Sequence, residues 1–156
     1  RSSAASDVYK RQVTCMNKKI VFLFICIITL ILGGLYMYNK NTEKHYIDTQ
    51  KKRIDLFFQN NLKNYENSSI DSIQKTPMGS IELKGHINNK KNLYFNVKLN
   101  KETNYQFNGD LGQSKDLTEK YIKTFSDKQK TPSELIKEKK LNKNDYEADP
   151  PLIWGF

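Results

Sequence analysis

SIELKGHINNKKNLYFNVKL, residues 80–99, is the stretch that decides the fold. Apolar and polar residues alternate in each half of it, which is typical of a β-strand with one buried face. We therefore predict strands at residues 80–87 and 92–99, joined by a hairpin loop at residues 88–91. The residues expected to point inward are Ile81, Leu83, Gly85, Ile87, Leu93, Phe95, Val97 and Leu99.

Polar residues occupy the other positions of the same strands. They are Glu82, Lys84, His86, Tyr94, Asn96 and Lys98, and a further strand predicted at residues 104–109 adds Gln106 and Asn108. This face is a candidate surface for binding a carbohydrate or an anionic polymer through Tyr94 and the lysines. The competing interpretation is an ordinary solvated face, because polar outer faces are the rule in antiparallel sheets.

An amphipathic helix is expected at residues 43–66, before the strands. Its apolar positions recur at spacings that place them on one helical face: Ile47, Ile54, Phe58, Leu62 and Tyr65. A weaker strand at residues 70–76 and a turn at residues 77–79 connect this helix to the hairpin. Because three or four strands with one apolar face need a cover, we predict an α+β fold in which the helix packs on an antiparallel β-meander.

Residues 20–38 form an apolar run of nineteen residues without a charge. As a helix, the run would be roughly 28 Å long, close to the hydrocarbon thickness of a bilayer. Tyr36 and Tyr38 stand where an interfacial aromatic belt would lie, and no small-x-small cleavage site follows. We therefore expect residues 16–38 to be an uncleaved membrane anchor, with the N-terminus inside the cell and the C-terminal domain outside. The alternative is a cleaved signal peptide and a secreted protein.

The first fifteen residues are expected not to be native. Residues 7–12 read DVYKRQ, which resembles the translated end of a sequencing adaptor. Translation would then begin at Met16, and Cys26 would be the only cysteine, so that no disulfide framework is available. The alternative is a natural extension without fixed structure.

The charge pattern argues against nucleic acid as a partner. The whole chain has a net charge of +9, but the part after Tyr38 has 21 basic against 16 acidic residues, well interspersed. Only Arg1, Arg11 and Arg53 are arginines, whereas nucleic-acid readers usually cluster Arg and Lys among aromatic residues. We therefore expect a solvated surface.

No motif for catalysis, metal binding or cofactor binding is recognisable. His45 and His86 are far apart, and neither has a cysteine or a suitably spaced acid to complete a ligand set. A glycine-rich phosphate loop and a nucleophile elbow are both missing from the sequence. We therefore expect no cofactor, no metal and no enzymatic activity.

Residues 112–156 are expected to form a helical and partly disordered extension of the domain at residues 39–111. One short helix is predicted at residues 116–125, and a second begins at Thr131 and Pro132, with Glu134 completing a capping pattern. Residues 142–149 lack an apolar pattern and are expected to be disordered or loosely bound. The tail, residues 150–156, holds the only tryptophan. It either packs back onto the domain or docks on a partner.

Four stretches together resemble a known protein family: QKKRIDLFF at residues 50–58, KTPMG at 75–79, GHINN at 85–89 and FNG at 107–109. The family is the small membrane-anchored proteins of staphylococci and related Firmicutes known as domain-of-unknown-function family 1433. The resemblance implies an N-terminal hydrophobic segment, a helix and an antiparallel sheet. It implies no activity and no functional residues.

The sequence therefore favours a membrane-tethered, non-enzymatic binding module at a Gram-positive cell envelope. Its expected partners are the membrane, through residues 20–38, and an envelope protein, a peptide or an anionic wall polymer. A tether raises the local concentration of the domain, so a weak binding face suffices. A pilin-like assembly component is the second hypothesis, although the processing motif of such proteins is missing around residues 19–24.

Overall fold

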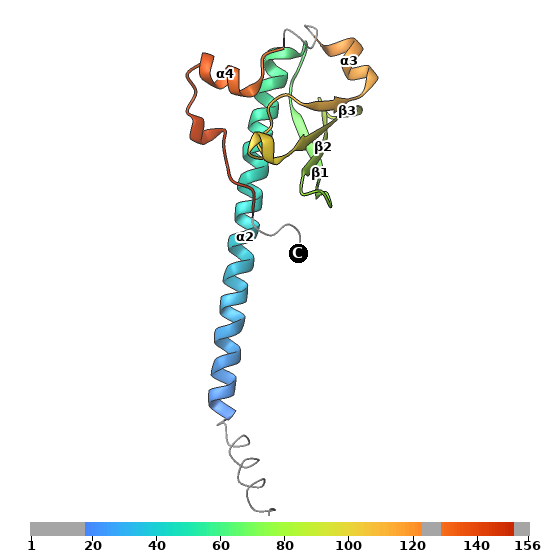
Figure 1. The fold of residues 1–156 in the computed structure, drawn as a ribbon. Helices are drawn as coiled ribbons and strands as arrows, with labels where there is room; N and C mark the ends of the chain where they lie inside the picture. Colours follow the sequence, from blue (N-terminus) through green and yellow to red (C-terminus); the bar gives the residue numbers. More distant parts are fainter. Residues whose placement is uncertain (1–17, 123–128, 152–156) are drawn as a thin grey trace, which may run out of the picture. The chain divides into compact units, whose positions relative to one another are not determined.

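The computed structural model describes residues 18–122 and 129–151. The elements are, in order, α2 (Lys18–Asn61), β1 (Ser68–Lys75), β2 (Ile81–Ile87), β3 (Lys90–Leu99), the 3₁₀ helix η1 (Lys101–Thr103), β4 (Leu111–Gln113), α3 (Lys115–Tyr121), α4 (Pro132–Glu138) and the 3₁₀ helix η3 (Lys143–Asp145) (Figure 1). The predicted α+β class is confirmed.

The chain divides into an N-terminal unit, Arg1–Lys40, and a C-terminal unit, Asn41–Phe156. The segment predicted to be non-native, residues 1–15, lies outside the described residues.

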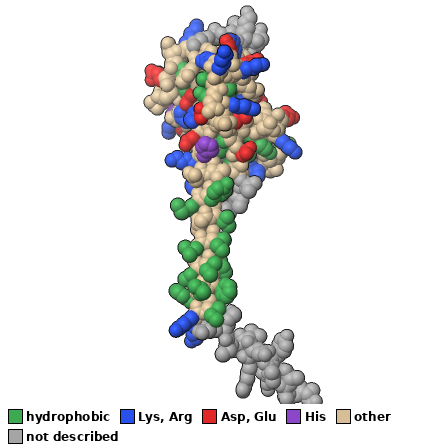
Figure 2. All heavy atoms as spheres, turned by 90° about the vertical axis from the view of Figure 1, so that its left-hand side faces the viewer, with side chains coloured by type: hydrophobic (Ala, Val, Ile, Leu, Met, Phe, Trp, Pro, Cys, Tyr) green, Lys and Arg blue, Asp and Glu red, His purple; other side chains and the backbone are tan. Residues whose placement is uncertain are grey.

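The N-terminal unit is helical throughout its described residues. Its large hydrophobic side chains are exposed: Phe22 to 69% and Leu30 to 76%. Figure 2 shows hydrophobic side chains along this part of α2, while the charged side chains gather mainly on the C-terminal unit. Because such a surface is unfavourable in water, and the helix is long and apolar enough to cross a bilayer, α2 contains a candidate membrane span. This is consistent with the predicted membrane association through residues 20–38.

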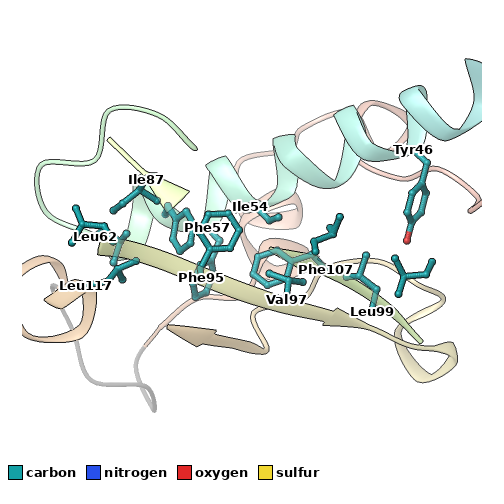
Figure 3. Close-up of a cluster of buried hydrophobic side chains, with 14 residues drawn as sticks. Tyr46, Ile54, Phe57, Leu62, Ile87, Phe95, Val97, Leu99, Phe107 and Leu117 are labelled. Atoms are coloured by element: carbon teal, nitrogen blue, oxygen red, sulfur yellow. The ribbon is translucent and has the colours of Figure 1, made fainter. Parts of the chain in front are cut away.

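The sheet of the C-terminal unit is an antiparallel meander in the order β1-β2-β3-β4. One face of β2 and β3 is buried at every second residue, as the alternation in the sequence predicts. The apolar side of α2 covers that face (Figure 3). The rings of Phe58 and Phe95 meet edge to face with centroids 5.1 Å apart, and those of Phe57 and Phe107 meet at 5.5 Å. Such pairs contribute about 0.5–1.5 kcal/mol each beyond the burial of their surface.

The hairpin between β2 and β3 is tighter than the predicted loop at residues 88–91. Only Asn88 and Asn89 make the turn, with φ angles of 52° and 55°. Both are in the left-handed region that a two-residue type I′ turn requires, and asparagine tolerates it better than most residues. Strand β3 therefore begins at Lys90, two residues earlier than predicted.

Helix α2 ends at Asn61, five residues before the predicted end. After it, Leu62 forms a β-bridge with Ile122, and the backbone N–H of Lys63 donates to the carbonyl of Tyr121 at 2.6 Å. Asn64 then takes a left-handed conformation, φ 51°, which turns the chain toward β1. The helical periodicity does continue to Tyr65, but pairing with the end of α3 replaces the last helical turn.

The strand predicted at residues 104–109 is wrong. Asn104 and Tyr105 have φ angles of 50° and 57°, so the chain turns after η1 instead of extending. Phe107 is buried, but it reaches the core from this turn and not from a strand. The fourth strand is β4, which pairs with β3 so that Leu111 lies opposite Val97. Gln106 and Asn108 consequently do not belong to the polar face of the sheet.

Two short helices follow, close to the predicted positions. In α3, capped by Ser114, Leu117 is buried in the core. In α4, capped by Thr131, the predicted capping box with Glu134 is present. Leu135 and Ile136 of α4 pack against Leu56 of α2 in a second, smaller apolar cluster.

Residues 142–149 differ from the prediction of a disordered or loosely bound segment, and the described chain continues to residue 151. They include η3, and Tyr146 packs against the smaller apolar cluster. We call residues 142–151 the strap. Its last residue, Pro151, is buried. The remainder of the predicted apolar tail, residues 152–156, and the end of the first predicted C-terminal helix, residues 123–125, lie outside the described residues.

Candidate functional site

The structure brings all six predicted site residues onto one face of the sheet. Strands β2 and β3 place them in directly opposed pairs: Glu82 with Lys98, Lys84 with Asn96, and His86 with Tyr94. Strand β1 extends the same face, because Ser69, Ser72 and Gln74 are the register partners of His86, Lys84 and Glu82. The alternation that buries one face of β2 and β3 thus assembles the polar face on the other side.

The charged groups of this face are largely paired within it. Glu82 accepts a hydrogen bond from the amide of Asn96 at 2.8 Å and lies 3.4 Å from Nζ of Lys84. The amide hydrogen bond, with the nearby lysine charges, holds the pKa of Glu82 below its usual value. The imidazole of His86 lies 2.9 Å from a carboxylate oxygen of Asp71, on the bulge of β1. The face therefore offers little net charge to an anionic ligand.

The side chains of Tyr94 and Lys98 are exposed on the face, where a ligand can reach them. The side chain of Tyr94 is on a residue 57% exposed, beside His86 on the next strand. The amide oxygen of Asn96 is shielded from solvent and has no hydrogen-bond partner among the described residues. An unmade hydrogen bond of this kind costs stability. An exposed ring among amides and hydroxyls suits a neutral, hydroxyl-rich ligand with an apolar face.

A second polar cluster lies around Arg53, which is only 1% exposed. Its guanidinium donates to the carbonyl of Phe107 at 2.7 Å, to the carbonyl of Tyr146 at 3.2 Å and to the hydroxyl of Ser133 at 3.0 Å. Burial lowers the pKa of Arg53, and the carboxylate of Glu147, 3.9 Å away, partly opposes this effect.

The neighbouring Gln50 completes this cluster. Its side-chain carbonyl accepts the backbone N–H of Phe107 at 2.8 Å, and its amide donates to Gln106 at 2.7 Å. The stretches QKKRIDLFF and FNG are both part of the family resemblance. They meet because the side chains of Gln50 and Arg53, in the first stretch, both bond to the backbone of Phe107 in the second. A cavity of about 860 Å³ opens beside Arg53. It lies between the strap, residues 101–108 and Ser133 of α4.

The sequence interpretation did not single out the Arg53 cluster. Helical periodicity marks apolar positions as buried and gives no role to polar residues such as Gln50 and Arg53. One signal was present: Arg53 is the only arginine after residue 15 in a chain whose other basic residues there are all lysines. A planar guanidinium can donate to several fixed carbonyls at once, which an ammonium group cannot do in the same geometry.

No metal site is found within residues 18–122 and 129–151: no three His, Cys, Asp or Glu side chains lie close enough to hold an ion. His86 faces Asp71 alone, and His45 is exposed on α2.

The protein family of unknown function DUF1433 matches residues 46–138, more than half of the chain. The chain belongs to the DUF1433 family. The matched residues of this DUF1433 protein include both strands of the polar face and the side chains of Gln50 and Arg53. The strap lies beyond them. No curated protein matches the chain.

A solved structure also resembles the DUF1433 protein described here. It is the solution NMR structure of the folded 79-residue fragment of Lin0334 from Listeria innocua. The two chains are 22% identical, with a TM-score of 0.46. The similarity covers 60% of this chain and 94% of the fragment.

Proposed function

We propose that this DUF1433 protein is a non-enzymatic, membrane-tethered binding module of a Gram-positive cell envelope. The N-terminal part of α2 spans the cell membrane, the C-terminal unit lies outside the cell, and the polar face of the sheet binds envelope glycan. The single observation that carries the choice of surface is Tyr94, an aromatic residue 57% exposed on a face of amides, hydroxyls and paired charges.

The pairing of the charges favours a glycan over an anionic wall polymer. Lys84 shares Glu82 with Asn96, and Asp71 lies against His86, so a polyanion would have to displace these partners and would meet one further exposed cation, Lys98. A neutral sugar can stack on Tyr94 without separating charges. Weak binding suffices, because the anchor confines the module to the vicinity of its ligand.

Co-sedimentation with insoluble peptidoglycan tests this function. The full chain in detergent micelles is mixed with peptidoglycan that either retains its covalently attached anionic polymers or has been stripped of them. We expect equal binding to both preparations, and a loss of about two- to tenfold for Tyr94→Ala, the size of one aromatic contact. Met78→Ala is the matched control, because Met78 is 92% exposed but lies in the turn before β2, outside the face.

Two results would overturn the proposal. Binding that disappears after stripping assigns the ligand to the anionic polymer instead of the glycan. Equal binding by the wild type and Tyr94→Ala, or no sedimentation of either, removes the sheet face as the binding surface.

A further inference from the structure

The strap is held to the rest of the C-terminal unit mainly through its main chain. Arg53 donates to the carbonyl of Tyr146 at 3.2 Å. The side-chain amide of Gln106 donates to the carbonyl of Ala148 at 2.8 Å and accepts the N–H of Ala148 at 3.4 Å. A side-chain amide that pairs with both backbone groups of one residue acts as a neighbouring β-strand would. Such contacts accept many peptide sequences.

Two side chains of the strap add specificity. The ring of Tyr146 packs against the smaller apolar cluster, formed by Leu56, Leu135 and Ile136. The carboxylate of Glu147 is the only acidic group within 4.0 Å of the Arg53 guanidinium among the described residues. The strap therefore binds as a short 3₁₀ helix followed by an aromatic and an acidic residue, Tyr146 and Glu147.

The ion pair between Arg53 and Glu147 is incomplete. The two groups are 3.9 Å apart, and Glu147 also lies 3.3 Å from Nζ of Lys143. The Arg53 side chain is 2% exposed, whereas that of Glu147 is 39% exposed. The cavity of about 860 Å³ beside them shows that the strap leaves part of the groove unfilled. A carboxylate placed closer to the guanidinium gains a stronger, charge-assisted contact.

We propose that α2, residues 101–108 and α4 form a peptide-binding groove, which the strap occupies within the same chain. The groove accepts, from another protein, a peptide segment in which an aromatic residue precedes an acidic one. Its main-chain contacts are to Arg53 and Gln106, and its carboxylate takes the position of Glu147. All residues of the groove lie within the DUF1433 match at residues 46–138, and the strap lies outside it. The strap is therefore an internal competitor attached to the family domain.

The competition can be measured with a peptide copy of the strap. A tethered segment acts at an effective concentration of order millimolar, so the wild-type strap should largely exclude the same sequence added from outside. The probe is a fluorescein-labelled peptide NKNDYEADPP, residues 142–151, and the readout is fluorescence anisotropy with the full chain in detergent micelles. The strap is weakened by Tyr146→Ala together with Glu147→Gln. Asn144→Ala is the matched control, because Asn144 is exposed in the strap.

We expect the strap-weakened chain to bind the peptide at least tenfold more tightly than the wild type or Asn144→Ala. A peptide whose glutamate is replaced by glutamine should bind the same variant several-fold more weakly. If the strap-weakened chain binds the peptide no more tightly than the wild type, the proposal of a groove open to other peptides is overturned. Equal affinity for the glutamate and glutamine peptides overturns the proposed role of Arg53 in reading an acid.

A second measurement does not depend on the double variant being folded. Hydrogen exchange of the Ala148 amide is followed in the wild type while unlabelled peptide is added to several millimolar. Displacement of the strap frees this amide from Gln106 and accelerates its exchange, while amides of β2 and β3 are unaffected. An Ala148 exchange rate that stays constant over the titration contradicts displacement.

Discussion

The ring of Phe95 on β3 lies over Gly85, its register partner on β2. A Cβ atom at Gly85 would stand 2.7 Å from Cζ of Phe95 and 2.2 Å from the backbone oxygen of Ser69 on β1. The three strands approach one another around a position without a side chain, and the aromatic ring fills the space above it. An aromatic residue opposite a glycine commonly compensates for the missing side chain in this way.

Gly85→Ala should destabilise the fold by about 1–3 kcal/mol or more, because the added methyl displaces either Phe95 or the backbone of β1. Gly112→Ala on β4 is the control, since the nearest atom to its added Cβ is 3.9 Å away. Urea unfolding of both variants measures the difference. Similar unfolding free energies for the two variants would show that a methyl group fits at Gly85 without displacing its neighbours.

Substitution by glycine should have opposite effects on stability at the two turn residues, Asn88 and Asn89. Both have left-handed φ angles, which favours glycine by a few tenths of a kcal/mol at Asn89. The side chain of Asn88, however, accepts the N–H of Glu66 at 2.9 Å and donates to the carbonyl of Asn64 at 2.7 Å. Asn88→Gly should therefore cost about 1 kcal/mol in thermal or urea unfolding. A stabilised Asn88→Gly variant would contradict the role of its side chain.

Arg53→Lys should release the strap as well as lower stability. Lysine cannot serve the three acceptors of Arg53 from one position, so at least one buried carbonyl loses its donor, at a cost of about 1–3 kcal/mol. Hydrogen exchange should accelerate more in the strap than in β2 and β3. Lys52→Met, on the exposed side of the same helix, is the control. Uniform acceleration over the whole unit would show that Arg53 does not hold the strap in particular.

The capping box of α4 predicts a pH dependence. The carboxylate of Glu134 accepts hydrogen bonds from the backbone N–H and hydroxyl of Thr131 at 2.8 and 3.0 Å, which lowers its pKa below the usual 4.5. Since the folded-state pKa is the lower one, this stabilisation is complete above pH 4.5 and is lost as the pH falls through the folded-state value. Exchange of the Thr131 amide should accelerate over that acidic range. In Glu134→Gln the same amide should show no such titration; a titration that persists there would assign it to another group.

The sequence predicts the parts of this fold that depend on alternation and on capping. The buried positions of β2 and β3 follow from the period of two, and α4 begins where Thr131, Pro132 and Glu134 indicate. The same alternation at Tyr105 and Phe107 was misleading, because the left-handed backbone of Asn104 and Tyr105 is not visible in an apolar pattern. A short periodic run does not distinguish a strand from a turn that delivers one aromatic side chain to the core.

The two candidate sites also differ in whether a local sequence pattern predicts them. The polar face follows from strand register, so its six residues were predictable once the hairpin was recognised. The Arg53 cluster depends on contacts between residues more than fifty positions apart, and its polar side chains are buried because main-chain carbonyls satisfy them. No local pattern carries that information. For the same reason the sequence predicts residues 142–149 of the strap, which are polar and have little periodicity, to be disordered or loosely bound.

Membrane retention and topology test the central claim most directly. The chain from Met16 onward is expressed with a C-terminal tag in a Gram-positive host. Membranes are then washed at alkaline pH, and intact protoplasts are treated with protease. The tethered module predicts a full-length band that stays with the membrane and is digested from outside. A shortened, tagged protein in the medium, or a full-length protein protected from the protease, would contradict it.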